Sequence, residues 1–153
     1  MKHDHHITIA NPAMEPFAML VGGWSMTATH PDFPGRTFHG HATFEWLEGG
    51  AFLLMRSTMD EPAIPNAVAI LGSDEDHASH FMLYFDERGV SRKYEMALRH
   101  NIWHWWRNAP GFSQRFTGSI TDRGHTIAGK WELSQNDSTW HPDLELTYQK
   151  SDA

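Results

Sequence analysis

The clearest chemical spacing in this chain belongs to two histidines and a glutamate near residue 40. His39, His41 and Glu45 stand at positions i, i+2 and i+6. On a β-strand these three side chains project from one face, because successive side chains alternate between faces. Two imidazoles and a carboxylate are a common ligand set for a divalent transition metal. The spacing therefore permits a metal site, with a polar, solvated strand face as the alternative.

The same spacing, His-x-His-x-x-x-Glu, resembles the first half of the motif of cupin metal enzymes. The second half of that motif needs a turn rich in glycine and proline and then a further histidine. Residues 108–111 supply such a turn, but His104 precedes it and no histidine follows it on the next predicted strand. A cupin-like enzyme that uses His39, His41 and Glu45, with a divalent metal as cofactor, is one alternative function.

Other catalytic patterns in the sequence are weak. The chain contains no cysteine, which excludes disulfides, thiolate metal sites and a cysteine nucleophile. It has no G-x-S-x-G elbow, phosphate-binding loop or dinucleotide fingerprint. An isomerase or cyclase that uses Arg56, Tyr94 and His104 stays open, by analogy with enzymes built on similar barrels. Whether the protein is an enzyme is therefore left open.

The length and the net charge of the chain limit the classes of protein to which it can belong. The chain has 153 residues, of which 40% are apolar, the size of a single domain with a hydrophobic core. Its formal net charge of -7 argues against nucleic acid or an anionic membrane as a partner. The sequence shows neither a membrane span nor a secretory signal. We expect a soluble, cytoplasmic protein with a flexible His-rich tail over residues 1–11 and one domain over residues 12–150.

An alternation of apolar and polar residues begins after Val21 and continues along the chain. In residues 24–29 and 38–46, mostly apolar side chains alternate with polar ones, which is the period of a β-strand. Turn sequences such as DERG and DRG separate about ten such segments, a pattern typical of all-β barrels. Closure of the sheet removes its exposed edges. The sequence predicts an all-β fold, a closed antiparallel up-and-down barrel of about ten strands, with a short helix at residues 12–20.

The more apolar face of each predicted strand is expected to point into the barrel. This assignment places five polar residues among bulky apolar ones inside: Arg56, Arg92, Tyr94, His104 and Gln114. A ten-stranded barrel is wide enough to leave a cavity, and such a lining is typical of a small-molecule site. The leading hypothesis is binding of a small, largely apolar molecule with a polar or anionic end. The predicted ligand-binding residues are Phe44, Trp46, Leu54, Arg56, Tyr94, His104, Trp106, Gln114 and Phe116.

Residues 101–108, NIWHWWRN, contain three of the seven tryptophans of the chain. The same assignment of faces places His104 and Trp106 inside the barrel, and Trp103 and Trp105 outside. Two exposed tryptophans on one strand face are typical of a subunit interface. The sequence therefore predicts a homodimer that uses Trp103 and Trp105.

Several short motifs, in order along the chain, resemble those of the bacterial DUF1579-type families. They are LVGGW at residues 20–24, EWLEGGAFLLMR at residues 45–56, and KWEL at residues 130–133 followed by a W-x-x-D motif. Those families are lipocalin-like (calycin) β-barrels, and few of them have an assigned function. The resemblance covers about residues 13–150 and implies a bacterial protein with such a barrel.

The Gly22-x-Trp24 sequence is similar to the Gly-x-Trp motif of lipocalins. In lipocalins this tryptophan plugs one end of the barrel and follows a short N-terminal helix. The resemblance implies the same position for Trp24. Lipocalins often carry an arginine near the end of the last strand, where this chain has Lys150.

Nitrobindin-like haem proteins have barrels of the same shape and provide a second alternative. They use a glycine-rich extension of the Gly-x-Trp motif and a histidine late in the chain as the axial ligand. In this chain Met26 and Thr27 follow GGWS without further glycines, and His141 is the late histidine. The resemblance implies a haem-binding barrel with haem as its cofactor.

Overall fold

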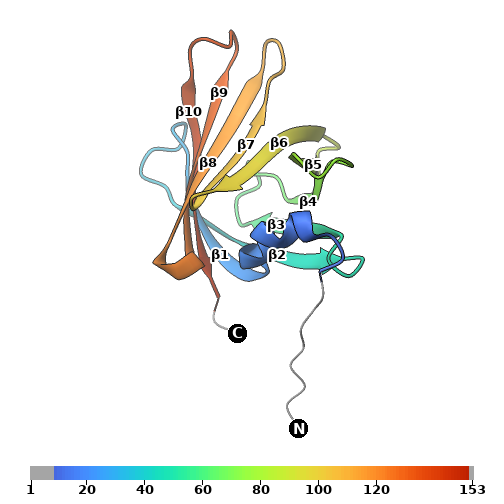
Figure 1. Ribbon diagram of the computed structural model, residues 1–153. Coiled ribbons are helices and arrows are strands. Elements are labelled where there is room, and N and C mark those ends of the chain that lie inside the picture. Colours follow the sequence, from blue (N-terminus) through green and yellow to red (C-terminus); the bar gives the residue numbers. More distant parts are fainter. Residues whose placement is uncertain (1–8, 152–153) are drawn as a thin grey trace.

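Ten β-strands and two short 3-10 helices make up residues 9–151, the part of the chain that the structure, a computed structural model, describes. Each strand is antiparallel to its sequence neighbours, and β1 also pairs with β10, so the sheet closes into a barrel (Figure 1). The predicted all-β, closed up-and-down barrel with a short N-terminal helix is confirmed. The His-rich residues 1–8 lie outside the described residues. The elements are η1 (Pro12–Leu20), β1 (Gly22–Thr29), β2 (Phe38–Leu47), β3 (Phe52–Met59), β4 (Ala67–Ser73), β5 (His80–Asp86), β6 (Ser91–Arg99), β7 (Ile102–Arg107), β8 (Ser113–Thr121), η2 (Asp122–Gly124), β9 (Thr126–Ser134) and β10 (His141–Lys150).

The helix η1 covers one end of the barrel (Figure 1). It begins after Asn11, whose side-chain oxygen accepts a hydrogen bond from the backbone N–H of Ala13 at 3.1 Å. Pro16 has no N–H to donate inside the helix, which favours a short 3-10 element over a continuous α-helix. Neither η1 nor η2 is long and apolar enough to cross a membrane. The side chains that η1 buries are Met14, Phe17 and Leu20.

Trp24 closes this end of the barrel from inside. Its side chain is 1% exposed, and its indole N–H donates to the carbonyl of Leu20 at 2.8 Å. Lys150, which faces Trp24 across the β1–β10 pair, lies 5.2 Å from the centre of the indole ring. The Lys150 ammonium also donates to the carbonyl of Met19 at 2.8 Å. A lysine therefore ties the helix to the last strand where lipocalins often carry an arginine.

The inner face of the barrel follows the predicted alternation on six strands, which are β1, β2, β6, β8, β9 and β10. On β3, β5 and β7 the predicted face is wrong, because residues of the other parity, such as Leu53, Met82 and Trp103, are completely buried. These three strands carry large apolar side chains on both faces. A change of one residue in phase exchanges the two faces of a strand, and alternation cannot choose between two apolar faces.

Trp103 and Trp105 lie inside the barrel, so the prediction that they face outward at a subunit interface is wrong. They are 0% and 2% exposed, and their ring centres are 4.8 Å apart. Trp105 also lies 4.6 Å from the ring of Phe116 and 5.1 Å from that of Trp131. The rings extend from β7 across β8 to β9 and form an aromatic cluster in the core.

Two glycines make room for Phe116 at the centre of this cluster. Gly118 and Gly129 pair with each other across β8 and β9, and Phe116 is completely buried beside them. A Cβ atom at Gly129 would overlap the Phe116 ring, and one at Gly118 would lie 2.9 Å from the Ile127 side chain. The packing of the ring therefore requires that position 129 carry no side chain.

We expect Gly129→Ala to lower the free energy of unfolding by about 1–3 kcal/mol, because the added methyl group overpacks a filled core. Urea unfolding followed by circular dichroism measures the change. The double variant Gly129→Ala with Phe116→Leu should recover part of the loss, since leucine vacates the space of the ring. An unchanged stability in the single variant would contradict the requirement for glycine.

Candidate functional site

The barrel contains a cavity of about 360 Å³ at the end opposite η1. This volume lies within the range of about 300–1,000 Å³ that is usual for small-molecule sites. The loops that follow β1, β3, β5, β7 and β9 surround this end of the barrel, whereas η1 lies at the other end (Figure 1). These loops therefore form the mouth of the cavity.

Most of the cavity wall is apolar. Trp105 and Trp131 belong both to the wall and to the aromatic cluster, so the packed core forms one side of the cavity. Methionine side chains are flexible and adapt to apolar surfaces of different shape. The wall therefore suits a largely apolar molecule without dictating its outline. The larger apolar side chains that line it are Met26, Met55, Met59, Ile64, Trp105, Phe112, Trp131, Leu133, Leu144 and Leu146.

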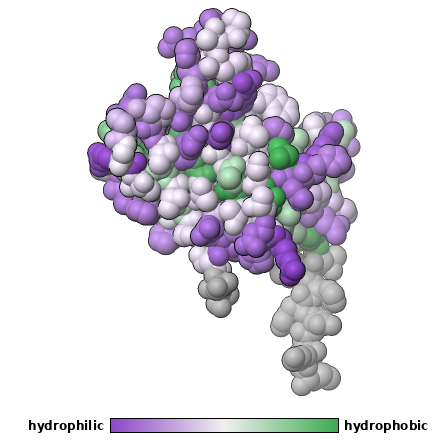
Figure 2. Space-filling view, turned by 90° about the vertical axis from the view of Figure 1, so that its left-hand side faces the viewer, coloured by the Kyte–Doolittle hydropathy of each residue, from purple (hydrophilic) through white to green (hydrophobic). Residues whose placement is uncertain are grey.

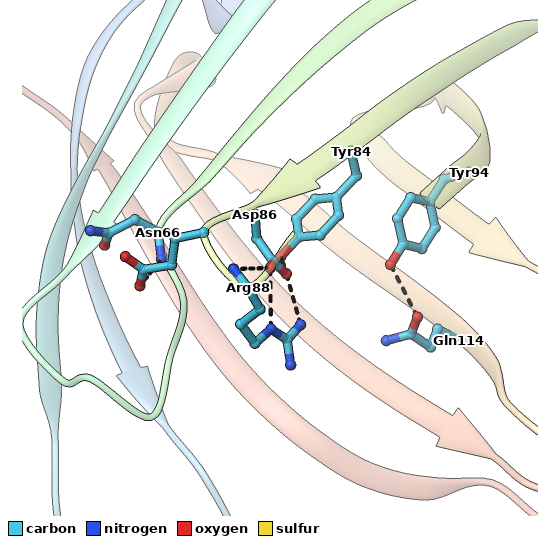
Figure 3. A network of polar contacts seen from close by, with 7 residues as sticks. Asn66, Tyr84, Asp86, Arg88, Tyr94 and Gln114 are labelled. Atoms are coloured by element: carbon cyan, nitrogen blue, oxygen red, sulfur yellow. Dashed lines mark hydrogen bonds and ion pairs between the residues drawn. The ribbon is translucent and has the colours of Figure 1, made fainter. Parts of the chain in front are cut away.

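A hydrogen-bonded pair of polar side chains interrupts the apolar wall. Tyr94 of β6 donates its O–H to Oε1 of Gln114 of β8 at 3.1 Å (Figure 3). The two residues are 2% and 7% exposed, and burial raises the pKa of Tyr94 against the opposing effect of the Arg92 guanidinium. The phenol therefore stays protonated and remains a donor. Among residues 9–151 the amide nitrogen of Gln114 has no hydrogen-bond acceptor, which leaves it available to a bound molecule.

A second polar group lies at the mouth (Figure 3). Asp86 accepts hydrogen bonds from the O–H of Tyr84 at 2.8 Å and from the guanidinium of Arg88 at 2.7 Å and 3.2 Å. The Asp86 side chain is inaccessible to solvent, and the hydrogen bonds from Arg88 lower its pKa to about 2, with a smaller effect of Tyr84. Burial, followed by the contact with Asp86, raises the pKa of Tyr84. The charge of Arg88 is therefore neutralised by Asp86.

Arg92 is the one arginine of the cavity wall that forms no ion pair with any residue in the range 9–151. It precedes Tyr94 by two residues on β6, on the same inner face. Its guanidinium lies 5.5 Å from the centre of the Phe112 ring, which is a cation–π distance. An unpaired guanidinium beside an apolar wall is suited to bind an anionic or hydrogen-bond-accepting group.

His30 and Asp143 lie at the mouth on the side of β1 and β10, across the barrel from β6. Nε2 of His30 is 2.8 Å from Oδ1 of Asp143, and Nδ1 of His30 accepts from the backbone N–H of Asp32 at 3.0 Å. Both nitrogens of the ring are therefore engaged. The contact joins β10 to the loop that follows β1, and it reinforces the closure of the barrel at its open end.

The structure places two of the nine predicted ligand-binding residues, Tyr94 and Gln114, in the cavity wall. Phe44 and Phe116 point inward but are buried in the core, and Trp46 packs against the same core. None of these three side chains lines the cavity. They occupy the correct face of their strands at a different height along the barrel axis.

The expectation that Leu54, Arg56, His104 and Trp106 face the interior is wrong. The first two lie on the outer face of β3 and the last two on the outer face of β7, where Arg56 and His104 are exposed. These are two of the three strands with large apolar side chains on both faces. Because Arg56 and His104 are outside and Tyr94 is inside, the three side chains do not form the site considered for isomerase or cyclase chemistry.

Arg92, Trp105, Trp131 and Tyr148 line the cavity but were not among the predicted ligand-binding residues. Alternation places Arg92, Trp131 and Tyr148 on inner faces, so part of the signal was present in the sequence. Their height along the barrel depends on the register between strands, which alternation does not give. Trp105 was missed because the face of β7 was inverted.

His39, His41 and Glu45 lie on the outer face of β2, and all three are exposed. His39 and Glu45 are separated by about 20 Å along the strand, because each residue advances by about 3.3 Å. In the described part of the chain, no group of three or more His, Cys, Asp or Glu side chains is placed to hold a metal ion. The three side chains are therefore spread too far along one strand to bind the same metal ion.

His141, the late histidine of the haem alternative, is exposed at the start of β10 and does not line the cavity. His30 does line it, but both of its ring nitrogens are engaged, with Asp143 and Asp32. No other histidine within residues 9–151 lines the cavity. The described residues of the cavity wall therefore do not supply the free histidine that axial ligation in the haem alternative requires.

Comparison with known proteins supports the fold. No protein-family model and no curated protein matches the chain. Among solved structures, it is similar to Rv2717c from M. tuberculosis, with a TM-score of 0.67 and 11% sequence identity, over 93% of this chain and 99% of that chain. At this identity the similarity shows a shared barrel fold, which is compatible with ligand binding. Membership of the DUF1579-type families stays a prediction.

We expect Asp86→Asn to lower the free energy of unfolding at neutral pH by about 1–2 kcal/mol, because it removes charge-assisted hydrogen bonds with Arg88. A carboxyl group with a folded-state pKa of about 2 stabilises the fold above its unfolded-state pKa of about 3.9. This stabilisation is lost as the pH falls from about 4 towards 2. Urea unfolding of the wild-type protein and of Asp86→Asn across this pH range should show that the difference between their free energies of unfolding becomes smaller as the pH falls.

Glu75→Gln, which alters an exposed carboxylate, serves as the control and should leave the pH dependence of unfolding unchanged. A difference between the wild-type protein and Asp86→Asn that stays constant down to about pH 2.5 would contradict the assigned role of the ionised carboxylate.

Proposed function

We propose that the barrel binds a small, largely apolar molecule whose polar or anionic end lies beside Arg92. The proposal rests on one observation: a guanidinium without an ion pair among residues 9–151 lies at the edge of a largely apolar cavity. The apolar wall would supply most of the affinity by burying the ligand, and the polar groups would fix its orientation.

The arrangement of the polar groups supports a ligand with two chemically different ends. Arg92 is stacked on Phe112 near the mouth, and the Gln114 amide lies on the neighbouring wall beside Tyr94. Trp105 and Trp131 form the aromatic part of the wall. An acidic or carbonyl group would accept hydrogen bonds from Arg92 and Gln114, while the apolar part of the molecule packs on the indole rings.

Two fluorescent probes of similar shape test the role of Arg92: 1-anilinonaphthalene-8-sulfonate, which is anionic, and N-phenyl-1-naphthylamine, which is neutral. We expect Arg92→Leu to weaken binding of the anionic probe about tenfold and that of the neutral probe by less than about twofold. Arg99→Leu, an exposed position on the same strand, should leave both dissociation constants unchanged. If Arg92→Leu weakened the binding of both probes equally, this would contradict a charge-specific role for Arg92.

Filling the cavity tests where the probes bind. Ser57 points into the cavity and pairs with Ala67, another small residue of the wall, whereas the next residue, Thr58, is exposed on the outer face. We expect Ser57→Phe to abolish or strongly weaken binding of both probes, because the ring occupies the cavity, and Thr58→Phe to leave binding intact. Binding that survives Ser57→Phe in a folded protein would place the probes elsewhere and contradict the proposed function.

A further inference from the structure

The outer face of β3, β4 and β5 forms an apolar patch on the barrel. The register of these strands places Leu54, Ile70 and Leu83 side by side in one row across the sheet. In a neighbouring row, Phe52 and Phe81 lie against Gly72, where a Cβ atom would come within 3.1 Å and 2.9 Å of the two rings. The residues of this patch are Phe52, Leu54, Val68, Ile70, Phe81, Leu83 and Phe85.

The patch is partly exposed and differs from the side of the barrel that bears β10, although Leu54 within it is buried. Phe52 and Phe85 are 38% and 44% exposed, although both are large aromatic residues. On the side of the molecule that bears β10, hydrophilic and intermediate residues cover most of the surface, with smaller apolar areas between them (Figure 2). There the outward residues of the β1–β10 pair include Ser25, Thr27 and Thr147. A concentration of exposed apolar side chains indicates an interaction surface.

The central row of the patch ends in opposite charges. Glu45 on β2 pairs with Leu54, and Lys93 on β6 pairs with Leu83, so the row reads Glu–Leu–Ile–Leu–Lys. Both charged residues are exposed, and neither has an ion-pair partner in the described range 9–151. The Lys93 ammonium lies 5.8 Å from the ring of Phe81, so it borders the patch.

We propose that this patch binds a second copy of the chain and forms a homodimer whose two-fold axis runs parallel to β4. This axis reverses the order of the central row in the second copy. Glu45 then faces Lys93 of the partner subunit, Lys93 faces Glu45 of the partner subunit, and the apolar residues meet in the middle. An axis along the row would place like charges opposite each other, which is unfavourable. The charge pattern therefore selects the orientation.

The same axis makes the flanking rows complementary. Phe52 and Phe81 exchange positions across the interface, so each ring meets a ring of the partner subunit. Arg56 and Phe85 also lie at opposite ends of a row, with Val68 between them. Each guanidinium therefore meets Phe85 of the partner subunit, a favourable cation–π arrangement. One surface that is complementary to itself in all three rows fits the isologous contact of a two-fold dimer.

The cavity and the patch are separate features. The patch lies on the outer face of β3–β5, whereas the cavity opens among the loops at one end of the barrel. The dimer leaves the mouth open and does not depend on the proposed ligand. Sheets that pack face to face commonly keep their strand directions within about 30° of each other, and an axis parallel to β4 aligns β4 with β4 of the partner subunit.

Sedimentation velocity of the full chain tests the dimer, which we expect to be present at concentrations on the order of 10 μM. Glu45→Lys alone and Lys93→Glu alone each turn both interfacial ion pairs into repulsive pairs, so each variant should raise the dimer dissociation constant about tenfold. An equimolar mixture of the two variants should restore dimerisation, because every charged contact between unlike copies is then attractive. The double variant should also restore it.

Two further variants control the result. Lys130→Glu changes the net charge as Lys93→Glu does, but lies on the outer face of β9, and should leave the dimer intact. Ile70→Lys, at the centre of the patch, should give a folded monomer, with folding checked by circular dichroism. A monomeric wild-type protein, a dimer that survives Ile70→Lys, or a mixture that associates no better than its single variants would overturn the proposal.

Discussion

The pairing of β1 with β10 is the constraint on which the rest of the structure depends. It joins opposite ends of the described chain and turns a meander of ten strands into a closed barrel without open edges. At one end the pair brings Lys150 against Trp24, and at the other end His30 is bound to Asp143. Closure gives every strand one inner and one outer face, so a single alternation decides which side chains can reach a ligand.

Side-chain size along the barrel axis divides the interior into a filled part and a hollow part. Towards η1 the inward positions carry large residues such as Trp24, Phe44 and Trp103, which are almost completely buried. Towards the mouth, Ser57 and Ala67 face each other on β3 and β4, and the space that they leave belongs to the cavity. A ten-stranded barrel is too wide to be filled without large side chains at every level. The cavity is present because the side chains at this level of the barrel are too small to fill it.

Strands with two apolar faces explain both the errors of the sequence analysis and the outer patch. On β3 the inner face contributes Leu53 and Met55 to the core, while the outer face carries Phe52 and Leu54. Alternation has no preferred phase on such a strand, so the positions of Arg56, and likewise of His104 on β7, could not be decided from it. The proposed dimer gives the outer apolar residues of β3–β5 a partner, which would account for their presence on a surface strand.

The sequence by itself determined the all-β class, the approximate number of strands, the short N-terminal helix and the inner faces of strands with one polar face, because period-two alternation is a local property. It also identified Tyr94 and Gln114 as inward polar residues. Only the tertiary structure decided the faces of β3, β5 and β7, the height of each side chain along the barrel, and the placement of Arg92 beside Phe112. These depend on the register between strands and on closure, which bring together residues far apart in the chain and leave no local signal.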